Sequence, residues 1–389
     1  MICIQDPTYA ESMLLHEALL QACSTAQYGA GAYAFVTADG VNLLMTDDMF
    51  SDFLKRGHYQ LIVGMDDITN TRTLVALQAI CDQYGDHLSP KALLHDTNGS
   101  TFHPKFSWFK CEQGGILVLG SGNLTHKGLR RNREAFVISE VDDREIAQIE
   151  VRWNSWIDSC HNYLKSIDDI DVVTKAKENE NKNKMPKGTS HRGSQTVIEA
   201  AQLEKIELND EADAWVFPSE MELNDEADAW VFSKEAEILI TEIPGRLGGN
   251  KRWNQVIFDA ETFRSYFGAQ PGVTAQYRIV IRDVQKDGTL GEIKYRPAVL
   301  GIGKNYSMEL SIPPGTQHPT YGRPLGVFAK ISSRTFLYMF VFPGNQGYGA
   351  LQDKVNMHRL RRDRLMQTTM TAEALNTLCP ALPILSYLG

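Results

Sequence analysis

The 389-residue sequence predicts two domains, an α/β layered domain over residues 1–172 and a mostly β domain over residues 233–389. Three observations predict this division. Strand-like and helix-like runs alternate through the first half of the chain, which is typical of a sheet flanked by helices. The second half consists mainly of short β-rich runs broken by Gly, Pro and Asn. Between them, residues 173–232 begin with a polar, lysine-rich stretch that lacks apolar periodicity and predicts a solvated linker.

The first domain alternates helices and strands in the order expected for one layered sheet. Apolar residues at helical spacing over 11–26, 46–57 and 70–84 predict three helices, and residues 142–165 predict a longer one. The predicted strands cover residues 32–37, 59–67, 91–96, 102–110, 115–121 and 134–141. Strands separated by helical runs favour a sheet with helices packed on its faces.

The second domain is predicted to contain about seven short strands and one early helix over residues 260–268. The predicted strands cover residues 235–243, 254–259, 275–284, 291–303, 307–313, 324–332 and 335–343. Short strands at this spacing, separated by turn residues, favour a small barrel or sandwich.

Composition excludes several classes of protein. The six cysteines show no CxxC spacing, so neither a disulfide framework nor a zinc ribbon is expected. No run approaches the roughly 18 apolar residues of a membrane helix, and the first residues lack a signal-peptide pattern. We therefore expect a soluble cytoplasmic protein with no membrane partner.

The net charge of −9 is distributed unevenly along the chain. Residues 1–200 carry 19 Lys and Arg against 26 Asp and Glu, residues 201–232 carry 1 against 10, and residues 233–389 carry 19 against 12. The last segment therefore has a net charge of +7, which is compatible with a face that contacts phosphates.

The acidic segment contains an internal duplication, because ELNDEADAWVF at residues 207–217 recurs at 222–232. Two copies are too few for a stacked repeat fold. The favoured interpretation is a tolerated insertion, with one Trp-Val-Phe triplet belonging to the fold. The alternative is an acidic strip that lies on the basic domain and competes with a polyanion for it.

Five polar residues on successive predicted strands suggest a catalytic site. His103 and Lys105 are two residues apart on one strand, so their side chains point to the same face. Ser121 and Asn123 repeat that relation at the end of the next strand, and Glu134 begins the one after. A histidine can attack phosphorus, lysine and asparagine can stabilise charge on its oxygens, and a carboxylate can orient an imidazole.

Taken in series, these residues resemble the phospholipase D superfamily, and their spacings resemble its restriction-endonuclease branch of the BfiI and NgoFVII type. The motif is H-x-K at 103–105, G-S-x-N at 120–123 and an acid eleven residues later. An aspartate usually follows the lysine in this family, whereas Lys110 and Glu112 stand in that stretch here. This departure weakens a lipase interpretation more than a nuclease interpretation.

The resemblance also implies an assembly, because superfamily chemistry needs two histidines and the motif occurs once in this chain. A homodimer with one active site at its two-fold axis would supply both. No HExxH motif or Cys/His set is present, so we expect no metal. No complete phosphate-binding loop or dinucleotide fingerprint is present either, so we expect no cofactor.

The second domain resembles, more loosely, the B-three-type DNA-binding pseudobarrel of plant transcription factors and of EcoRII-like and NgoFVII-like restriction enzymes. That family grips the major groove with two arms, and two loops of this chain match them in position and character. The candidate DNA-binding residues in these loops are Arg246, Lys251, Arg252, Trp253, Asn254, Lys304, Asn305 and Tyr306. Arg and Lys read guanine, and Asn reads adenine.

The sequence therefore predicts a dimeric, metal-independent type II restriction endonuclease that cleaves double-stranded DNA. The resemblance allows a separately encoded ATP-dependent helicase or translocase as an additional partner. One alternative is a phospholipase D-like phosphodiesterase that acts on a substrate other than DNA. A second alternative is a DNA-binding regulator with an inactive nuclease fold.

Overall fold

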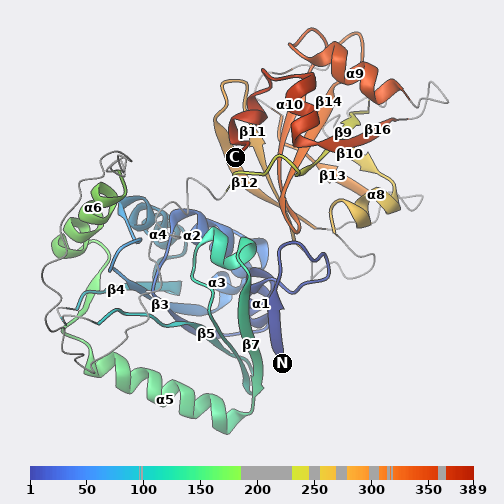
Figure 1. The fold of residues 1–389 in the computed structure, drawn as a ribbon. Helices are drawn as coiled ribbons and strands as arrows, with labels where there is room; N and C mark the ends of the chain where they lie inside the picture. Colours follow the sequence, from blue (N-terminus) through green and yellow to red (C-terminus); the bar gives the residue numbers. More distant parts are fainter. Residues whose placement is uncertain are drawn as a thin grey trace, which may run out of the picture.

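The structure of the chain is a computed structural model that describes residues 1–95, 97, 100–184, 230–244, 255–268, 278–297, 306–312, 316, 319–357 and 365–389. Two units follow one another along the chain, an N-terminal domain that ends at Lys184 and a C-terminal domain that begins at Trp230 (Figure 1). Within the described residues, no helix is both long and apolar enough to cross a membrane.

The N-terminal domain is built on one eight-stranded sheet. Its strands follow the order β1-β7-β6-β5-β2-β3-β4-β8. Their bounds are β1 (Ile2–Gln5), β2 (Tyr28–Tyr33), β3 (His58–Gly64), β4 (Leu88–Leu93), β5 (Lys105–Lys110), β6 (Gly115–Gly120), β7 (Glu134–Val141) and β8 (Leu164–Ser166). The neighbours β2, β3 and β4 run parallel, and the remaining pairs are antiparallel.

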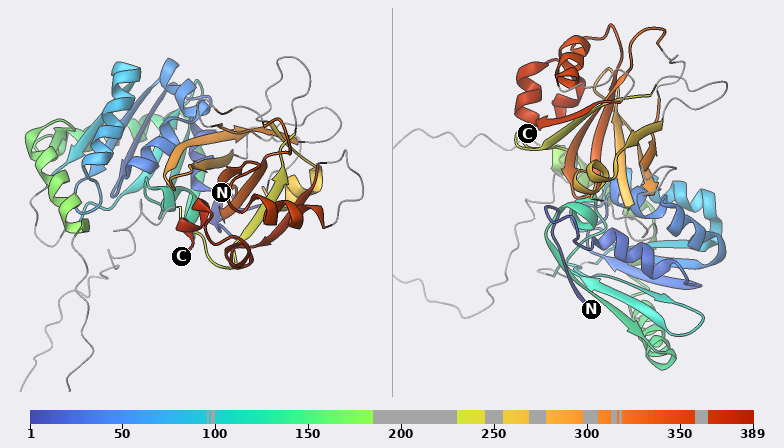
Figure 2. Two further views of the ribbon diagram at one scale, coloured as in Figure 1. Left: turned by 90° about the horizontal axis from the view of Figure 1, so that it is seen from above. Right: turned by 90° about the vertical axis from the view of Figure 1, so that its right-hand side faces the viewer.

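Helices cover both faces of this sheet (Figure 2). The helices are α1 (Leu15–Cys23), α2 (Ala38–Met45), α3 (Asp48–Arg56), α4 (Thr71–Tyr84), α5 (Asp143–Ser159) and α6 (Ile170–Lys184), with a π-helical turn η2 (Lys127–Arg131). Alternate residues of a strand face opposite sides. Tyr33 and Phe109 accordingly join the core beneath α1 to α4, whereas Ala32 and Trp108 face Trp153 of α5.

Local sequence explains where several helices begin. The Asp47 carboxylate accepts the Met49 N–H at 2.9 Å at the start of α3. Asp142 and Glu145 form a reciprocal capping box at the start of α5. These caps satisfy N–H groups that a helix leaves unpaired in its first turn.

The predicted boundary of the first domain at residue 172 is too early. Helix α6 continues to Lys184, through the first part of the predicted linker. Val172 and Ala176 are buried in the core. The Asn179 amide donates to the carbonyls of Met65 and Thr69, at 3.0 and 2.9 Å. Only every third or fourth residue of this stretch is buried, so its polar composition concealed a helix with a narrow packed face.

The C-terminal domain is mostly β, as predicted. A six-stranded sheet has the order β12-β11-β15-β14-β9-β16, and β10 pairs with β13 in a separate ribbon. The strands are β9 (Glu237–Glu242), β10 (Gln255–Phe258), β11 (Arg278–Val284), β12 (Leu290–Pro297), β13 (Tyr306–Glu309), β14 (Leu325–Ser332), β15 (Thr335–Val341) and β16 (Gln367–Thr371). The sequence did not predict β16, and closure into a pseudobarrel stays a prediction.

Three helices accompany these strands, α8 (Ala260–Ser265), α9 (Tyr348–Asn356) and α10 (Ala372–Leu378). An aromatic core that includes Phe258, Phe263 and Phe328 fills one side of the sheet. On the other side, Leu351 of α9 and Leu375 of α10 join the core that contains Val327. The sequence analysis did not predict α9 or α10.

Candidate active site

Strand pairing brings the predicted catalytic residues to one edge of the N-terminal sheet. Lys105 begins β5 and pairs with Tyr33 at the end of β2. On its other side, β5 pairs with β6, whose last residue is followed directly by Ser121. Beyond the end of β2, the Phe35 N–H donates to the Asn123 side-chain oxygen at 3.3 Å. The predicted catalytic residues, which span 31 positions from His103 to Glu134, therefore share one end of the sheet.

His103 and Lys105 lie in direct contact. The Lys105 Nζ is 3.0 Å from Nε2 and 3.1 Å from Nδ1 of His103. Lys105 is buried, whereas the His103 side chain is exposed. His103 itself precedes the strand, which begins at Lys105 and not at residue 102 as predicted. The site thus presents an accessible imidazole supported by a buried ammonium.

The surroundings of His103 favour its neutral form. Burial of part of the ring, followed by the positive charge of Lys105, lowers the pKa of His103 below its ordinary value. Asp66 has the opposite and smaller effect. A neutral imidazole has a free lone pair on one nitrogen, so it can act as a nucleophile at neutral pH.

Ser121 and Glu134 form a second contact within the site. The Ser121 hydroxyl donates to a Glu134 carboxylate oxygen and accepts the Ala135 N–H at 3.1 Å. The Asn132 amide donates to the other Glu134 oxygen at 3.0 Å. The sequence suggested that Glu134 orients an imidazole, but these bonds engage its two oxygens with a hydroxyl and an amide.

Two residues beside the site were not singled out as catalytic from the sequence. Asp66 follows β3, and its carboxylate accepts the Phe102 N–H at 2.9 Å. The His95 Nε2 lies 3.5 Å from the other Asp66 oxygen. Asp66 follows the end of β3, and His95 follows the end of the parallel strand β4. Polar residues just beyond the ends of parallel strands often lie at a functional site, and this was the sequence pattern that could have identified them.

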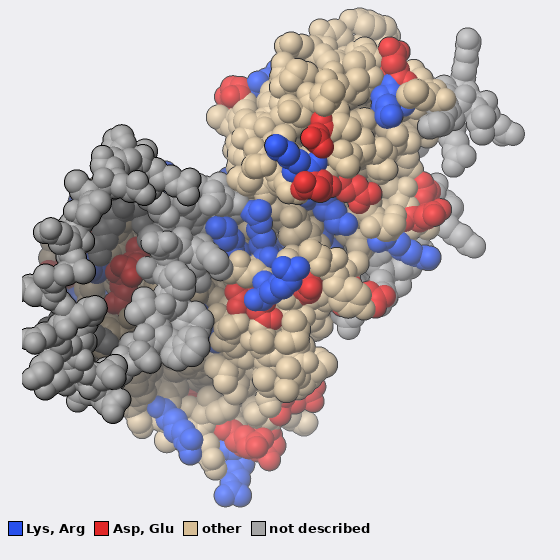
Figure 3. All heavy atoms as spheres, in the orientation of Figure 1, with Lys and Arg blue, Asp and Glu red and all other residues tan. Residues whose placement is uncertain are grey.

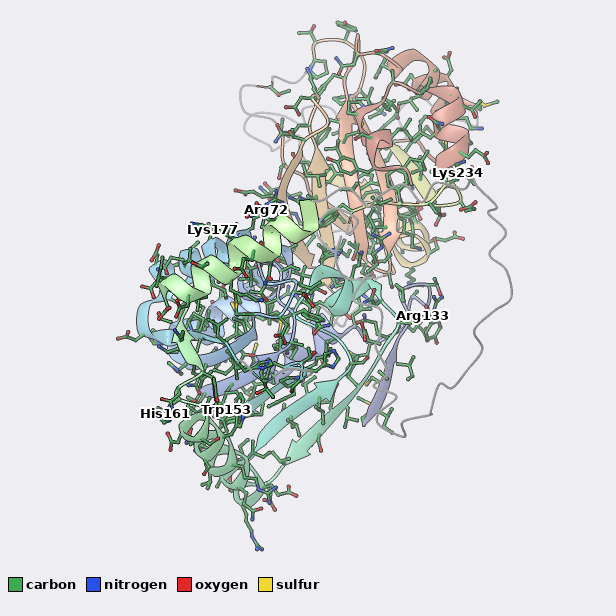
Figure 4. The ribbon with its side chains drawn as sticks, turned by 60° about the vertical axis from the view of Figure 1, so that its left-hand side comes forward. Arg72, Arg133, Trp153, His161, Lys177 and Lys234 are labelled. Atoms are coloured by element: carbon green, nitrogen blue, oxygen red, sulfur yellow. The ribbon has the colours of Figure 1, made fainter. Side chains whose placement is uncertain are left out.

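An apolar cavity of about 430 Å³ lies on the opposite face of β5 from Lys105. Phe106 and Trp108 line it from the strand, and Trp153 and Trp156 line it from α5. Figure 4 labels Trp153 on this helix. The cavity is separated from Lys105 by the sheet itself, so it is not part of the polar site.

The predicted DNA-binding arms fall almost entirely outside the described residues. Those not described are Arg246, Lys251, Arg252, Trp253, Asn254, Lys304 and Asn305. Tyr306 is described and corrects the prediction, because it is buried and its ring stacks on Phe263 at a centroid distance of 4.3 Å. Tyr306 is a core residue of the β10–β13 ribbon and presents no surface to a ligand in this structure.

Lys and Arg side chains gather where the two domains meet, on the face shown in Figure 3. In the part of the chain that the structure describes, no group of three or more His, Cys, Asp or Glu side chains is placed to hold a metal ion.

No protein-family model matches the sequence, and no curated protein matches it. Similar solved structures include NucT from Helicobacter pylori, with 16 % identity and a TM-score of 0.28 over 39 % of this chain and 92 % of that protein. They also include Nuc, a phospholipase D family member from Salmonella typhimurium, with 16 % identity and a TM-score of 0.31 over 43 % of this chain and 95 % of that protein.

A phosphatidylserine synthase from Haemophilus influenzae is similar at 14 % identity, with a TM-score of 0.30 over 42 % of this chain and 39 % of that protein. The TM-scores are too low to decide a function, so the functional assignment rests on the residues of the site.

Proposed function

We propose that this protein is a phosphodiesterase of the phospholipase D type. The observation that carries the proposal is the contact between an exposed His103 and a buried Lys105, with Asn123, Ser121 and Glu134 on adjoining strand ends. Within that class, we propose a type II restriction endonuclease that cleaves double-stranded DNA without a metal. The spacing of the motif and the basic C-terminal domain support this more specific function.

In the proposed reaction, a His103 ring nitrogen attacks phosphorus in line with the leaving oxygen. A P–N bond forms, the bond from phosphorus to the leaving oxygen breaks, and a second imidazole supplies the proton that this oxygen takes. Water then displaces the histidine and completes hydrolysis. Lys105 and Asn123 stabilise the charge on the remaining phosphoryl oxygens.

The second imidazole is proposed to come from another copy of the same chain. A two-fold interface presents the same patch twice, so it can place two copies of His103 at one phosphate. In this arrangement Glu134 and Ser121 together would face the partner's imidazole. Mixing inactive His103→Ala chains with wild type should then depress activity beyond simple dilution, whereas a catalytically active monomer would exclude this arrangement.

Chemistry and substrate can be tested in one assay. The wild-type protein is incubated with plasmid and phage DNA in EDTA, and discrete fragments are expected. His103→Ala should abolish cleavage, a loss of about 10³-fold or more, and quenching in an alkaline denaturant should trap a phosphohistidine adduct in wild type only.

Two outcomes of this assay would redirect the proposal. Cleavage that stops in EDTA and returns with Mg²⁺ would contradict histidine as the nucleophile. Intact DNA combined with hydrolysis of a small phosphodiester or a phospholipid would favour the alternative substrate class.

Recognition is proposed to reside in the C-terminal domain, through the two loops that contain Arg252, Asn254 and Asn305. Replacing any of the three by alanine should cost about 1–3 kcal/mol of binding and relax specificity at one base position. Competition gel shifts with the full-length protein would measure this. A uniform loss on every sequence would instead assign the replaced residue to phosphate contacts.

A further inference from the structure

The segment of residues 121–134, which connects β6 to β7 and includes the first residue of β7, joins the candidate active site to the C-terminal domain. Ser121 and Asn123 lie at its start, Glu134 lies at its end, and η2 lies between them. In Figure 1, η2 is on the side of the N-terminal domain that faces the C-terminal domain. Figure 4 labels Arg133, which follows η2 in the same region.

Arg130 of η2 is fully buried and is held by the C-terminal domain. Its Nε donates to the Thr335 hydroxyl at 3.0 Å. One terminal nitrogen donates to the carbonyls of Arg278 and Arg334, at 2.9 and 3.1 Å. The planar guanidinium has its donors in a fixed fork, so these three acceptors fix the position of Arg130 closely.

The turn between β14 and β15 supplies one of these acceptors, the first residue of β15 supplies another, and the turn contacts the N-terminal domain. Arg334 adopts a left-handed backbone conformation with φ of 56°, which is unfavourable for a residue with a side chain. Its guanidinium forms a two-pronged pair with Glu17 of α1, at 2.8 Å for each bond. The Ser333 N–H also donates to the Pro7 carbonyl at 2.8 Å. These contacts offset the unfavourable backbone and hold the turn in place.

Two more residues of the same segment contact the first residues of the C-terminal domain. The His126 ring packs on Trp230 at a centroid distance of 4.8 Å. Arg131 donates to the Val231 carbonyl at 2.6 Å. The C-terminal domain therefore holds the segment at three residues, 126, 130 and 131.

Movement at η2 would be transmitted directly to the polar site. Gly128 packs so closely on Asn123 that a Cβ there would lie 2.5 Å from the Asn123 carbonyl oxygen. At the other end, the Gln5 amide donates to the carbonyls of Gly128 and Asn132, at 3.1 and 2.8 Å. Asn132 in turn donates to Glu134. Asn123 and Glu134 thus depend on where η2 is held.

We propose that Arg130 is a positioning residue, through which the C-terminal domain sets the positions of Asn123 and Glu134 and so controls turnover. The inference rests on the proposed phosphodiesterase function and adds that turnover depends on the contact between the domains. This dependence does not require DNA, because the contacts are already formed in the free protein. It should be visible with a substrate that makes no use of DNA recognition.

The sharpest test compares Thr335→Val with Thr335→Ser in the full-length protein, using bis(p-nitrophenyl) phosphate as substrate. Valine has nearly the shape of threonine but cannot accept the bond from Arg130, whereas serine keeps the hydroxyl. Thr335→Val should lower kcat about tenfold with KM within about twofold of wild type, since misplaced catalytic groups slow the chemical step. Thr335→Ser should keep kcat near the wild-type value.

A second pair of variants separates positioning from loss of stability, and it also serves if Thr335→Val fails to fold. Arg130→Lys removes the fork of donors and should lower kcat in the same way. Arg323→Lys is the control, because Arg323 pairs with Glu242 at 3.1 Å inside the C-terminal domain and does not contact η2. It should leave kcat unchanged even where thermal unfolding shows a comparable loss of stability.

The outcomes of this test separate the two proposals. An active wild type whose kcat is unchanged in both Thr335→Val and Arg130→Lys would overturn the role of Arg130 alone. Equal losses of kcat in Arg130→Lys and Arg323→Lys would overturn it as well. A folded wild type that hydrolyses no phosphodiester would overturn the proposed function, and the role of Arg130 with it.

Discussion

Two clusters of charged residues are linked by the segment of residues 121–134, and each contains a carboxylate and basic side chains. The active-site cluster is built around His103, Lys105 and Glu134, and its imidazole is exposed. The interdomain cluster is built around Glu17, Arg130 and Arg334, all of which are buried. In the proposed function the exposed cluster acts on a substrate, whereas the buried cluster holds the two domains together. Residue type alone does not distinguish them.

The largest effect on stability is expected from Glu17→Gln. Glu17 neutralises Arg334 through two bonds and lies 3.9 Å from Arg130, so removing its charge leaves buried guanidinium groups uncompensated. The loss should be about 3–5 kcal/mol in the free energy of unfolding, measured in urea. The control is Glu150→Gln, which breaks a partly exposed pair with Lys110 and should cost less than about 1 kcal/mol. Equal losses would remove the distinction between buried and exposed pairs.

A slightly smaller effect should separate the two copies of the duplicated segment. Trp230 of the second copy is buried, packs on the His126 ring and donates to Asp39 at 3.2 Å. Trp230→Ala should cost about 3 kcal/mol by urea unfolding, because it empties a large packed volume. The matched variant is Trp215→Ala in the first copy, which lies outside the described residues; we expect a change within about 0.5 kcal/mol. A large loss in Trp215→Ala with little change in Trp230→Ala would show that the first copy packs between the domains.

The pH dependence of stability should reflect His126, which is buried beside the interdomain cluster. Burial, followed by the charge of Arg130, lowers the pKa of His126 well below its ordinary value of 6.5. The unfolded state therefore binds a proton at a higher pH than the folded state does. The contribution of neutral His126 to the free energy of unfolding is complete above about pH 6.5 and is lost as the pH falls below that value.

Urea unfolding at about pH 7.5 and 5.5 would measure this effect. Wild type should lose about 1–2 kcal/mol more than His126→Phe over that range, since each unit of pKa difference corresponds to about 1.4 kcal/mol. His161→Phe, at an exposed position, is the control and should behave as wild type. An unchanged pH dependence in His126→Phe would show that His126 does not titrate with unfolding.

The smallest expected effect is on the titration of His103. Lys105→Met removes the neighbouring positive charge and should raise the pKa of His103, while the effect of burial remains. NMR titration of the imidazole would measure the rise. Lys110→Met at the other end of β5 is the control and should leave that pKa in place. A pKa that does not rise in Lys105→Met would remove the ammonium as a cause of the shift.

Local patterns in the sequence predicted that the candidate catalytic residues lie near one another, because they stand at the ends of consecutive strands. Strand β7 was predicted with its observed bounds, and β5 and β6 were placed to within a few residues. The contact between His103 and Lys105 follows from their separation by one residue. The contact between Asn123 and Phe35 required knowledge of which strands pair, which periodicity does not supply.

The sequence by itself determined the division into an α/β part and a mostly β part, and it determined the residue types available at the site. Hydrophobic periodicity and turn residues are local properties, so they are legible in one chain. Only the tertiary structure decided that Tyr306 is a core residue, that Trp230 is buried, and that Arg130 bonds to Thr335 two hundred positions away. Burial and pairing depend on the whole fold, because a polar side chain is stable in the interior only where distant segments provide its partners.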